Sequence, residues 1–237
     1  MLVALILLAV SAVYASVGQG GGTGFLAVMA VAGVPVGDLR PTALAMNIVA
    51  ASYTTWRLHA IGFIDWRRLI SLAVPALPAA FVGGLVALPA GLYALVTGAL
   101  LLATALLMVM RPQAARWSIS PSTMGLAALG GAAGLFSGLS GIGGGVFVAP
   151  ALIALGWAGP KEAAGLSAPF ILGNSITGLA GALLSGQQLA SEFPLYAAAA
   201  LLGAAAGTAF IQRLSERTVR LVLAGIVAFA GFRLMSR

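Results

Sequence analysis

The stretch GIGGG at Gly141–Gly145 lies between two apolar runs, 123–140 and 146–158, and a near copy, GQGGG, occupies Gly18–Gly22. Glycine weakens a helix, and backbone without internal hydrogen bonds is not tolerated against lipid. Four glycines in five positions within apolar sequence therefore predict a helix that is broken at a place that lines a cavity or is buried in protein. Because the pattern occurs twice, we expect the two breaks to come together in one binding site.

The composition is that of an integral membrane protein. Apolar residues make up 61% of the 237 positions and charged residues only 7%, whereas a soluble domain carries roughly 25% charged residues. Runs that approach the roughly 20 apolar residues needed to cross a bilayer favour a helical bundle over a β-barrel. The net charge of +7 comes from cations at the ends of these runs, which is typical of topology signals and not of a nucleic-acid surface. The chain has no cysteine, and we expect neither a metal nor a cofactor.

The apolar segments form two sets of five. They fall at 1–17, 23–36, 41–62, 67–88 and 92–110, and again at 123–140, 146–158, 163–185, 193–212 and 218–235. The polar stretch 111–122 is the linker, so we predict a first transmembrane repeat at 1–110 and a second at 123–237. Five segments per half make the second copy enter the membrane in the opposite direction, as in many secondary transporters. The predicted fold is thus an all-α membrane protein of two inverted-topology repeats, in which 23–36 and 146–158 either cross fully or re-enter.

The positive charges predict the orientation, because cytoplasmic loops carry an excess of Lys and Arg. Short charged stretches at 38–40 and 161–162 are interpreted as turns, so that no cation lies inside the bundle. Alternate loops then carry nine cations on one side and three on the other, which places both termini on the outer side. The nine are Arg57, Arg67, Arg68, Arg111, Arg116, Lys161, Arg213, Arg217 and Arg220, and the three are Arg40, Arg233 and Arg237.

Each glycine stretch leads directly into a short apolar segment, so the free N–H groups of a helix N-terminus are expected to point into the break. Such an end carries roughly half a positive charge and attracts anions. Two of them facing each other predict a site for a small anion. The alternative is close helix packing by small residues and hydrogen bonding between helices. The candidate binding residues are Gly18, Gln19, Gly20, Gly21, Gly22, Thr23, Asn47, Ser140, Gly141, Gly143, Gly144, Gly145, Ser167 and Asn174.

These residues resemble the TauE/SafE family of sulfite and organosulfonate exporters over essentially the whole chain. The resemblance consists of a G-x-G-G-G break after the first helix of each half, a Thr- or Ser-containing segment with an asparagine (42–47 and 167–174), and the turn Gly62–Arg67. It implies export of a small sulfur-containing anion, such as sulfite or a sulfonate, across the bacterial inner membrane, and the two halves predict a carrier that works by alternating access. Composition and spacing by themselves indicate only a small anion.

Two other functions stay open. A passive anion channel can also be built from broken helices and can select by the field of helix ends. An intramembrane serine protease is suggested by the G-x-S-G pattern at Gly138–Gly141, although the single histidine, His59, precedes that serine in the chain. The expected partners are the small anionic substrate and the lipid bilayer, with no nucleic acid. Proton coupling and a homodimer are both compatible with the sequence.

Overall fold

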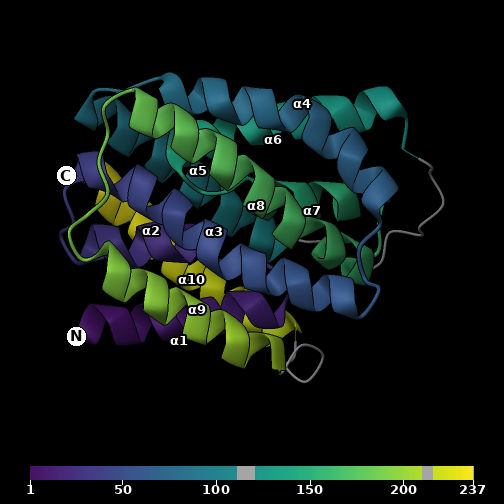
Figure 1. Cartoon of the computed structure of the whole chain (residues 1–237), viewed down its shortest axis with the longest axis horizontal. Helices are drawn as coiled ribbons and strands as arrows, with labels where there is room; N and C mark the ends of the chain where they lie inside the picture. The colour runs from purple at the N-terminus through teal and green to yellow at the C-terminus, as the bar shows by residue number, and fades with distance from the viewer. Residues whose placement is uncertain (111–120, 210–215, 237) are drawn as a thin grey trace.

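The computed structural model describes residues 1–110, 121–209 and 216–236, and every regular element in these ranges is a helix. The predicted linker 111–122 therefore lies, except for its last two residues, outside the described residues. All ten predicted segments are confirmed as helices (Figure 1). They are α1 (Leu2–Ser16), α2 (Gly22–Val31), α3 (Val36–Ala60), α4 (Trp66–Leu85), α5 (Ala90–Met110), α6 (Thr123–Ser140), α7 (Gly145–Ala154), α8 (Pro160–Leu184), α9 (Phe193–Ala209) and α10 (Glu216–Met235).

Helices α2 and α7 have 10 residues each, so each is about 15 Å long, half the thickness of a bilayer core. Each folds back along the helix before it. A methyl group built on Gly24 of α2 would contact Val10 and Tyr14 of α1, and one built on Gly125 at the start of α6 would contact Trp157, just beyond α7. Their length and this packing favour re-entrant segments over full spans, and the choice between the two stays a prediction.

The charged stretches 38–40 and 161–162 are helical, and the prediction that they are turns was wrong. They form the first turns of α3 and α8, which have 25 residues each. Asp38 and Glu162 lie near the N-termini of their helices, where negative charge is favourable. A search for apolar runs passes over such polar first turns, so α3 begins five residues earlier than predicted.

The pattern of helix packing is the same when the two halves of the chain are exchanged. Helix α4 packs along α6 and α8, whereas α9 packs along α1 and α3; α3 pairs with α8 and α5 with α10 (Figure 1). When the first five helices are exchanged for the last five, these pairs map onto one another. A two-fold relation between the halves would produce this packing. Their opposite orientation in a membrane stays a prediction.

Glycines allow two of these pairs to pack at backbone distance. Gly130, Gly134 and Gly138 of α6 face the backbone of α4, and Gly203 and Gly207 of α9 face the backbone of α1. Small residues at helix crossings are the usual means of packing helices in lipid. These glycines therefore serve packing, in contrast to the glycines of the two loops.

Helices α4, α6 and α8 each contain a stretch long and apolar enough to cross a bilayer, by length and composition. Helices α1, α2, α7 and α9 have fewer than 18 residues each. Large apolar side chains on the outside of the bundle, such as Ile70, Val74 and Phe229, are more than half exposed. Such a surface fits a lipid environment, where apolar groups need no cover.

Candidate functional site

The two glycine loops owe their shape to left-handed backbone. Gly18 and Gly21 have φ values of +75° and +101°, and Gly141, Gly143 and Gly144 have values of +83°, +90° and +76°. Side chains disfavour this region, so glycine is the residue that adopts it without strain. Gly21 and Gly144 are also the residues from which α2 and α7 begin. The glycines thus end one helix and begin the next within a few residues.

The two loops touch each other, and the expectation that they come together is confirmed. A methyl group on Gly22 would overlap the carbonyl oxygen of Ile142 and would lie 2.5 Å from Nδ2 of Asn47. One on Gly143 would lie 2.8 Å from the same Nδ2 atom. Asn47 of α3 therefore lies where the first loop meets the second. Gly20–Gly22 and Gly141–Gly145 are all buried, so this conformation closes the junction to water.

Ile171 of α8 fills the remaining space between the loops. Its side chain would lie within 2.9 Å of a methyl group on Gly20 or on Gly143, and within 2.6 Å of one on Gly145. This residue could not be found from the sequence, because an isoleucine in an apolar helix carries no signal of its own. Its place shows that α8 contacts the junction with an apolar side chain.

Three of the predicted binding residues have a buried oxygen without a hydrogen-bond partner among the described residues. Asn47 donates from Nδ2 to the Gly141 carbonyl at 3.5 Å, and Asn174 donates from Nδ2 to the Phe170 carbonyl at 2.9 Å. Their oxygens, Oδ1, are both unpartnered, as is Oε1 of Gln19. An unpaired buried polar group costs about 1–3 kcal/mol, and native structures keep few of them. Such groups are candidates for contact with a transported solute.

Three predicted binding hydroxyls are instead engaged within the protein. Thr23 hydrogen-bonds the hydroxyl of Tyr14, and Ser167 donates to the Ala163 carbonyl at 2.7 Å. Ser140 donates to the Phe136 carbonyl at 2.6 Å and accepts from the N–H of Ile142 at 3.3 Å. The structure thus uses these side chains to hold helices and the second loop. Within the described residues, no hydrogen bond joins Ser140 to a side chain that could act as its base.

Backbone N–H groups at the junction are free to take another acceptor. Those of Gly20, Gly21, Gly22 and Thr23 have no acceptor among the described residues, and neither have those of Gly143, Gly144 and Val146. The N–H of Gly145, in contrast, donates to the Gly143 carbonyl at 3.0 Å. Free N–H groups at a helix start favour an anion, through direct hydrogen bonds and through the helix dipole. Both half-helices present this chemistry.

A buried arginine, which the sequence analysis placed in an external turn, lies beside the second loop. Arg40 is only 2% exposed, and a methyl group on Gly141 would lie 3.0 Å from its carbonyl oxygen. Its guanidinium donates to the carbonyls of Gly84 and Val86 at 2.8 Å each, and its Nε donates to Oε1 of Gln187 at 2.9 Å. The expectation of no buried cation was therefore wrong. The reason is tertiary: the end of α4 and the α8–α9 loop cover the first turn of α3.

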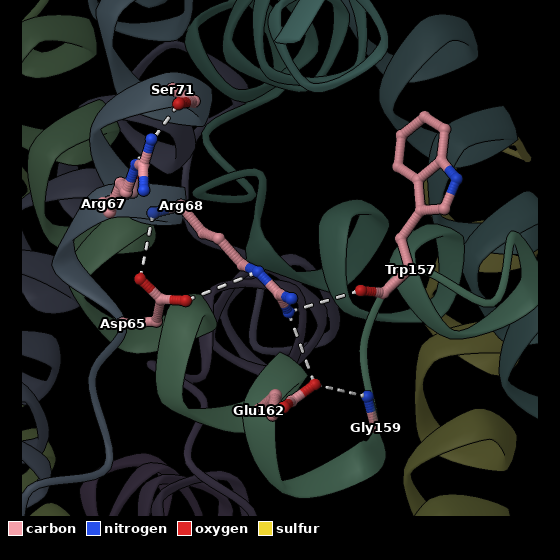
Figure 2. Close-up of polar contacts among 7 residues, drawn as sticks. All are labelled: Asp65, Arg67, Arg68, Ser71, Trp157, Gly159 and Glu162. Atoms are coloured by element: carbon pink, nitrogen blue, oxygen red, sulfur yellow. Dashed lines mark hydrogen bonds and ion pairs between the residues drawn. The ribbon is translucent and has the colours of Figure 1, made fainter. Parts of the chain in front are cut away.

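A second arginine, Arg68, follows the opposite end of α3 in the chain and contacts residues of the second half. Figure 2 shows these contacts. Arg68, in the first turn of α4, lies 3.4 Å from the carboxylates of Asp65 and Glu162 and donates to the Trp157 carbonyl at 3.4 Å. Asp65 also accepts from the N–H of Arg68 at 3.1 Å, which makes it the N-cap of α4. The turn Gly62–Arg67 that carries part of the family resemblance therefore has a structural role.

Comparison with known proteins places the chain in a family. Residues 3–234 match the model described as sulfite exporter TauE/SafE. A probable membrane transporter protein, y4hK, from Sinorhizobium fredii is 33% identical over 228 residues, which cover 94% of this chain and 92% of that protein. No solved structure gives a significant match. With its bundle of apolar helices and its two glycine breaks, the chain belongs to the TauE/SafE family of membrane transporters.

Proposed function

We propose that the protein is a secondary transporter that carries a small anion, sulfite or an organosulfonate, by alternating access. The observation that carries the proposal is the contact of Gly22 with the carbonyl of Ile142 beside Asn47. It brings the N-termini of two half-helices from the two halves of the chain to one place. Facing half-helix ends are a recurrent way to hold an anionic group in transporters.

The anion is expected to bind where the loops now touch. The free N–H groups of Gly20–Thr23 and of Gly143, Gly144 and Val146 would donate to its oxygens. The amides of Asn47 and Asn174 can present either an NH₂ group or an oxygen to the solute, and their oxygens have no other described partner. The remaining predicted glycines, Gly18, Gly141 and Gly145, would shape the loops, and Thr23, Ser140 and Ser167 would support them.

The burial of both loops favours a carrier over a channel. An open pore needs a continuous polar path, whereas here the junction is closed by Ile142 and Ile171, both of which are fully buried. Binding of a solute between the loops requires them to separate, which is the motion that alternating access supplies. We propose the bacterial inner membrane as the location, with the first turn of α3 and both termini facing outward. Proton coupling and a homodimer stay open within this proposal.

The family description names sulfite, so sulfur oxyanions are the first substrates to test. Purified protein in proteoliposomes should show saturable uptake and counterflow of radiolabelled sulfoacetate or sulfite. A channel would give flux without counterflow. Absence of saturable flux for sulfite, sulfoacetate and isethionate would contradict the proposed substrate class.

Gly22→Ala is the variant that addresses the junction itself. Gly22 lies outside the left-handed region, so its own backbone conformation accepts a methyl group, and the overlap is with the Ile142 carbonyl and Asn47 at the junction. Overpacking costs about 1–3 kcal/mol, and we expect counterflow to fall about tenfold. The matched control is Gly91→Ala, because a methyl group on Gly91 meets nothing within 4 Å. If both variants fold normally and transport equally well, the proposal that the solute binds at the junction is contradicted.

A further inference from the structure

The structure contains a cavity that the transport site does not account for. It lies at the end of the bundle where α3 begins, has a volume of about 170 Å³, and is lined by residues that include Gly37, Arg40, Leu88, Tyr93 and Gln187. The walls come from α3, the α4–α5 connection, α5 and the α8–α9 loop. Both halves of the chain therefore contribute to it.

The charge of Arg40 has no carboxylate partner. No acidic side chain among the described residues lies within ion-pair distance of its guanidinium, and the acceptors are carbonyls and the Gln187 amide. A guanidinium has five N–H donors, and Nη2 makes a single hydrogen bond, to Gly84. A buried cation without a counter-charge is costly. The cavity is thus lined by a residue whose positive charge has no carboxylate partner and whose Nη2 has one N–H without a described acceptor.

Two residues that line the cavity also contact the segment around the second glycine loop. Tyr93, which lines it, donates from its hydroxyl to the carbonyl of Ser140 at 2.8 Å. Nη1 of Arg40 lies 3.5 Å from the carbonyl of Leu139, one residue earlier. Gly141, the first glycine of the loop, packs against the backbone and Cγ of Arg40. Two residues that line the cavity, Arg40 and Tyr93, are therefore in contact with the end of α6, directly before the loop.

We propose that this cavity is a second anion site, a vestibule in which Arg40 binds a sulfonate or similar oxyanion before or after it occupies the glycine junction. Its place on the transport path rests on the proposed function, whereas anion binding by the cavity does not. Arg40 binds the anion through its spare N–H and its charge. The same residue, by capping α4, couples occupancy of the vestibule to the position of that helix against α6.

Two matched cysteine variants test the vestibule, because the chain has no cysteine of its own. Gly37 and Gly91 are both exposed, both are the second residue of their helices, and a methyl group on either meets nothing within 4 Å. Gly37 lines the cavity and Gly91 does not. Purified Gly37→Cys and Gly91→Cys proteins in detergent are treated with an anionic reagent, 2-sulfonatoethyl methanethiosulfonate, and with its cationic trimethylammonium analogue.

We expect Gly37→Cys to favour the anionic over the cationic reagent by about tenfold relative to Gly91→Cys, because a focused positive field raises the local concentration of anions. Sulfoacetate should slow the anionic labelling of Gly37→Cys and leave that of Gly91→Cys unchanged. Adding Arg40→Gln should abolish the preference, whereas Arg40→Lys should keep it. If an Arg40 variant does not fold, the comparison of Gly37→Cys with Gly91→Cys still shows whether the cavity attracts anions.

Equal reagent preference at the two positions, or labelling of Gly37→Cys that sulfoacetate leaves unchanged, would overturn the vestibule. This result is separate from the proposed function, since it is read without transport. Counterflow with no reagent preference would refute the vestibule alone. A clear preference in a protein that transports no sulfur oxyanion would keep the site and refute the substrate assignment.

Discussion

Two arginines hold the two halves together at opposite ends of α3, and their surroundings differ. Arg68 has a side chain that is 35% exposed and is paired with the carboxylates of Asp65 and Glu162. Arg40 is buried and is held by carbonyls and an amide. The 20 residues of α3 that follow Arg40 span about 30 Å, so these are separate junctions at the two faces of the bundle.

The positive charge of the Arg68 junction is neutralised by two carboxylates, whereas the positive charge of the Arg40 junction is not. Ion pairs exposed to water contribute about 0–1 kcal/mol, so the Arg68 end can open at little cost. The Arg40 end ties together the end of α4, the end of α6 and the α8–α9 loop, and Thr42 adds a hydrogen bond to the N–H of Ala190 at 2.9 Å. In the proposed alternating-access cycle the two faces open in turn, and this difference predicts that the Arg68 end opens more easily. The stability of each junction can be measured.

The largest effect is expected for Arg40→Met. It leaves the carbonyls of Gly84 and Val86 and the Gln187 amide oxygen without their donor, and unpaired acceptors of this kind cost about 1–3 kcal/mol each where water does not reach them. We expect a loss of about 3 kcal/mol, measured by SDS unfolding in mixed micelles. Arg68→Met, the matched control, should lose less than half as much. Equal losses would remove the contrast between the two ends.

An intermediate effect is expected when the Arg40 junction is changed to resemble the Arg68 junction. Gln187→Glu places a carboxylate where the amide oxygen now accepts from Nε of Arg40, and hydrogen bonds to charged groups contribute about 1.5–3 kcal/mol. We expect unfolding to become harder by about 1 kcal/mol, because Gln187 is only partly buried. The new negative charge should also reduce the anionic-reagent preference of Gly37→Cys. Gln187→Leu, as a control, should lower stability and keep that preference.

The smallest effect is expected at the exposed junction. In a double-mutant cycle of Arg68→Gln and Glu162→Gln, the coupling energy should be about 0.2–1 kcal/mol. It should decrease further as salt is raised, since exposed charges are screened. The measurement is SDS unfolding of the four proteins at two salt concentrations. A coupling above about 2 kcal/mol, or one that salt leaves unchanged, would show that this end is as tightly held as the other.

The sequence by itself determined the ten helices, the break at each glycine stretch and the membrane setting. These features follow from local chemistry: apolar runs, left-handed glycines and the scarcity of charge. It also pointed to Asn47, which lies at the junction of the loops. The motifs of the family resemblance pointed to the same glycine breaks and to Asn47. Another of these motifs, the turn at Asp65, is a helix cap in the structure.

Only the tertiary structure decided which residues share a site. It placed Ile171 between the loops, turned Thr23, Ser140 and Ser167 toward internal partners, and buried Arg40 under two segments that are distant in sequence. An arginine near a helix start has the same local pattern whether water or protein covers it. What covers it depends on how α4 and the α8–α9 loop pack, and packing between distant segments leaves no periodic signal in a single sequence.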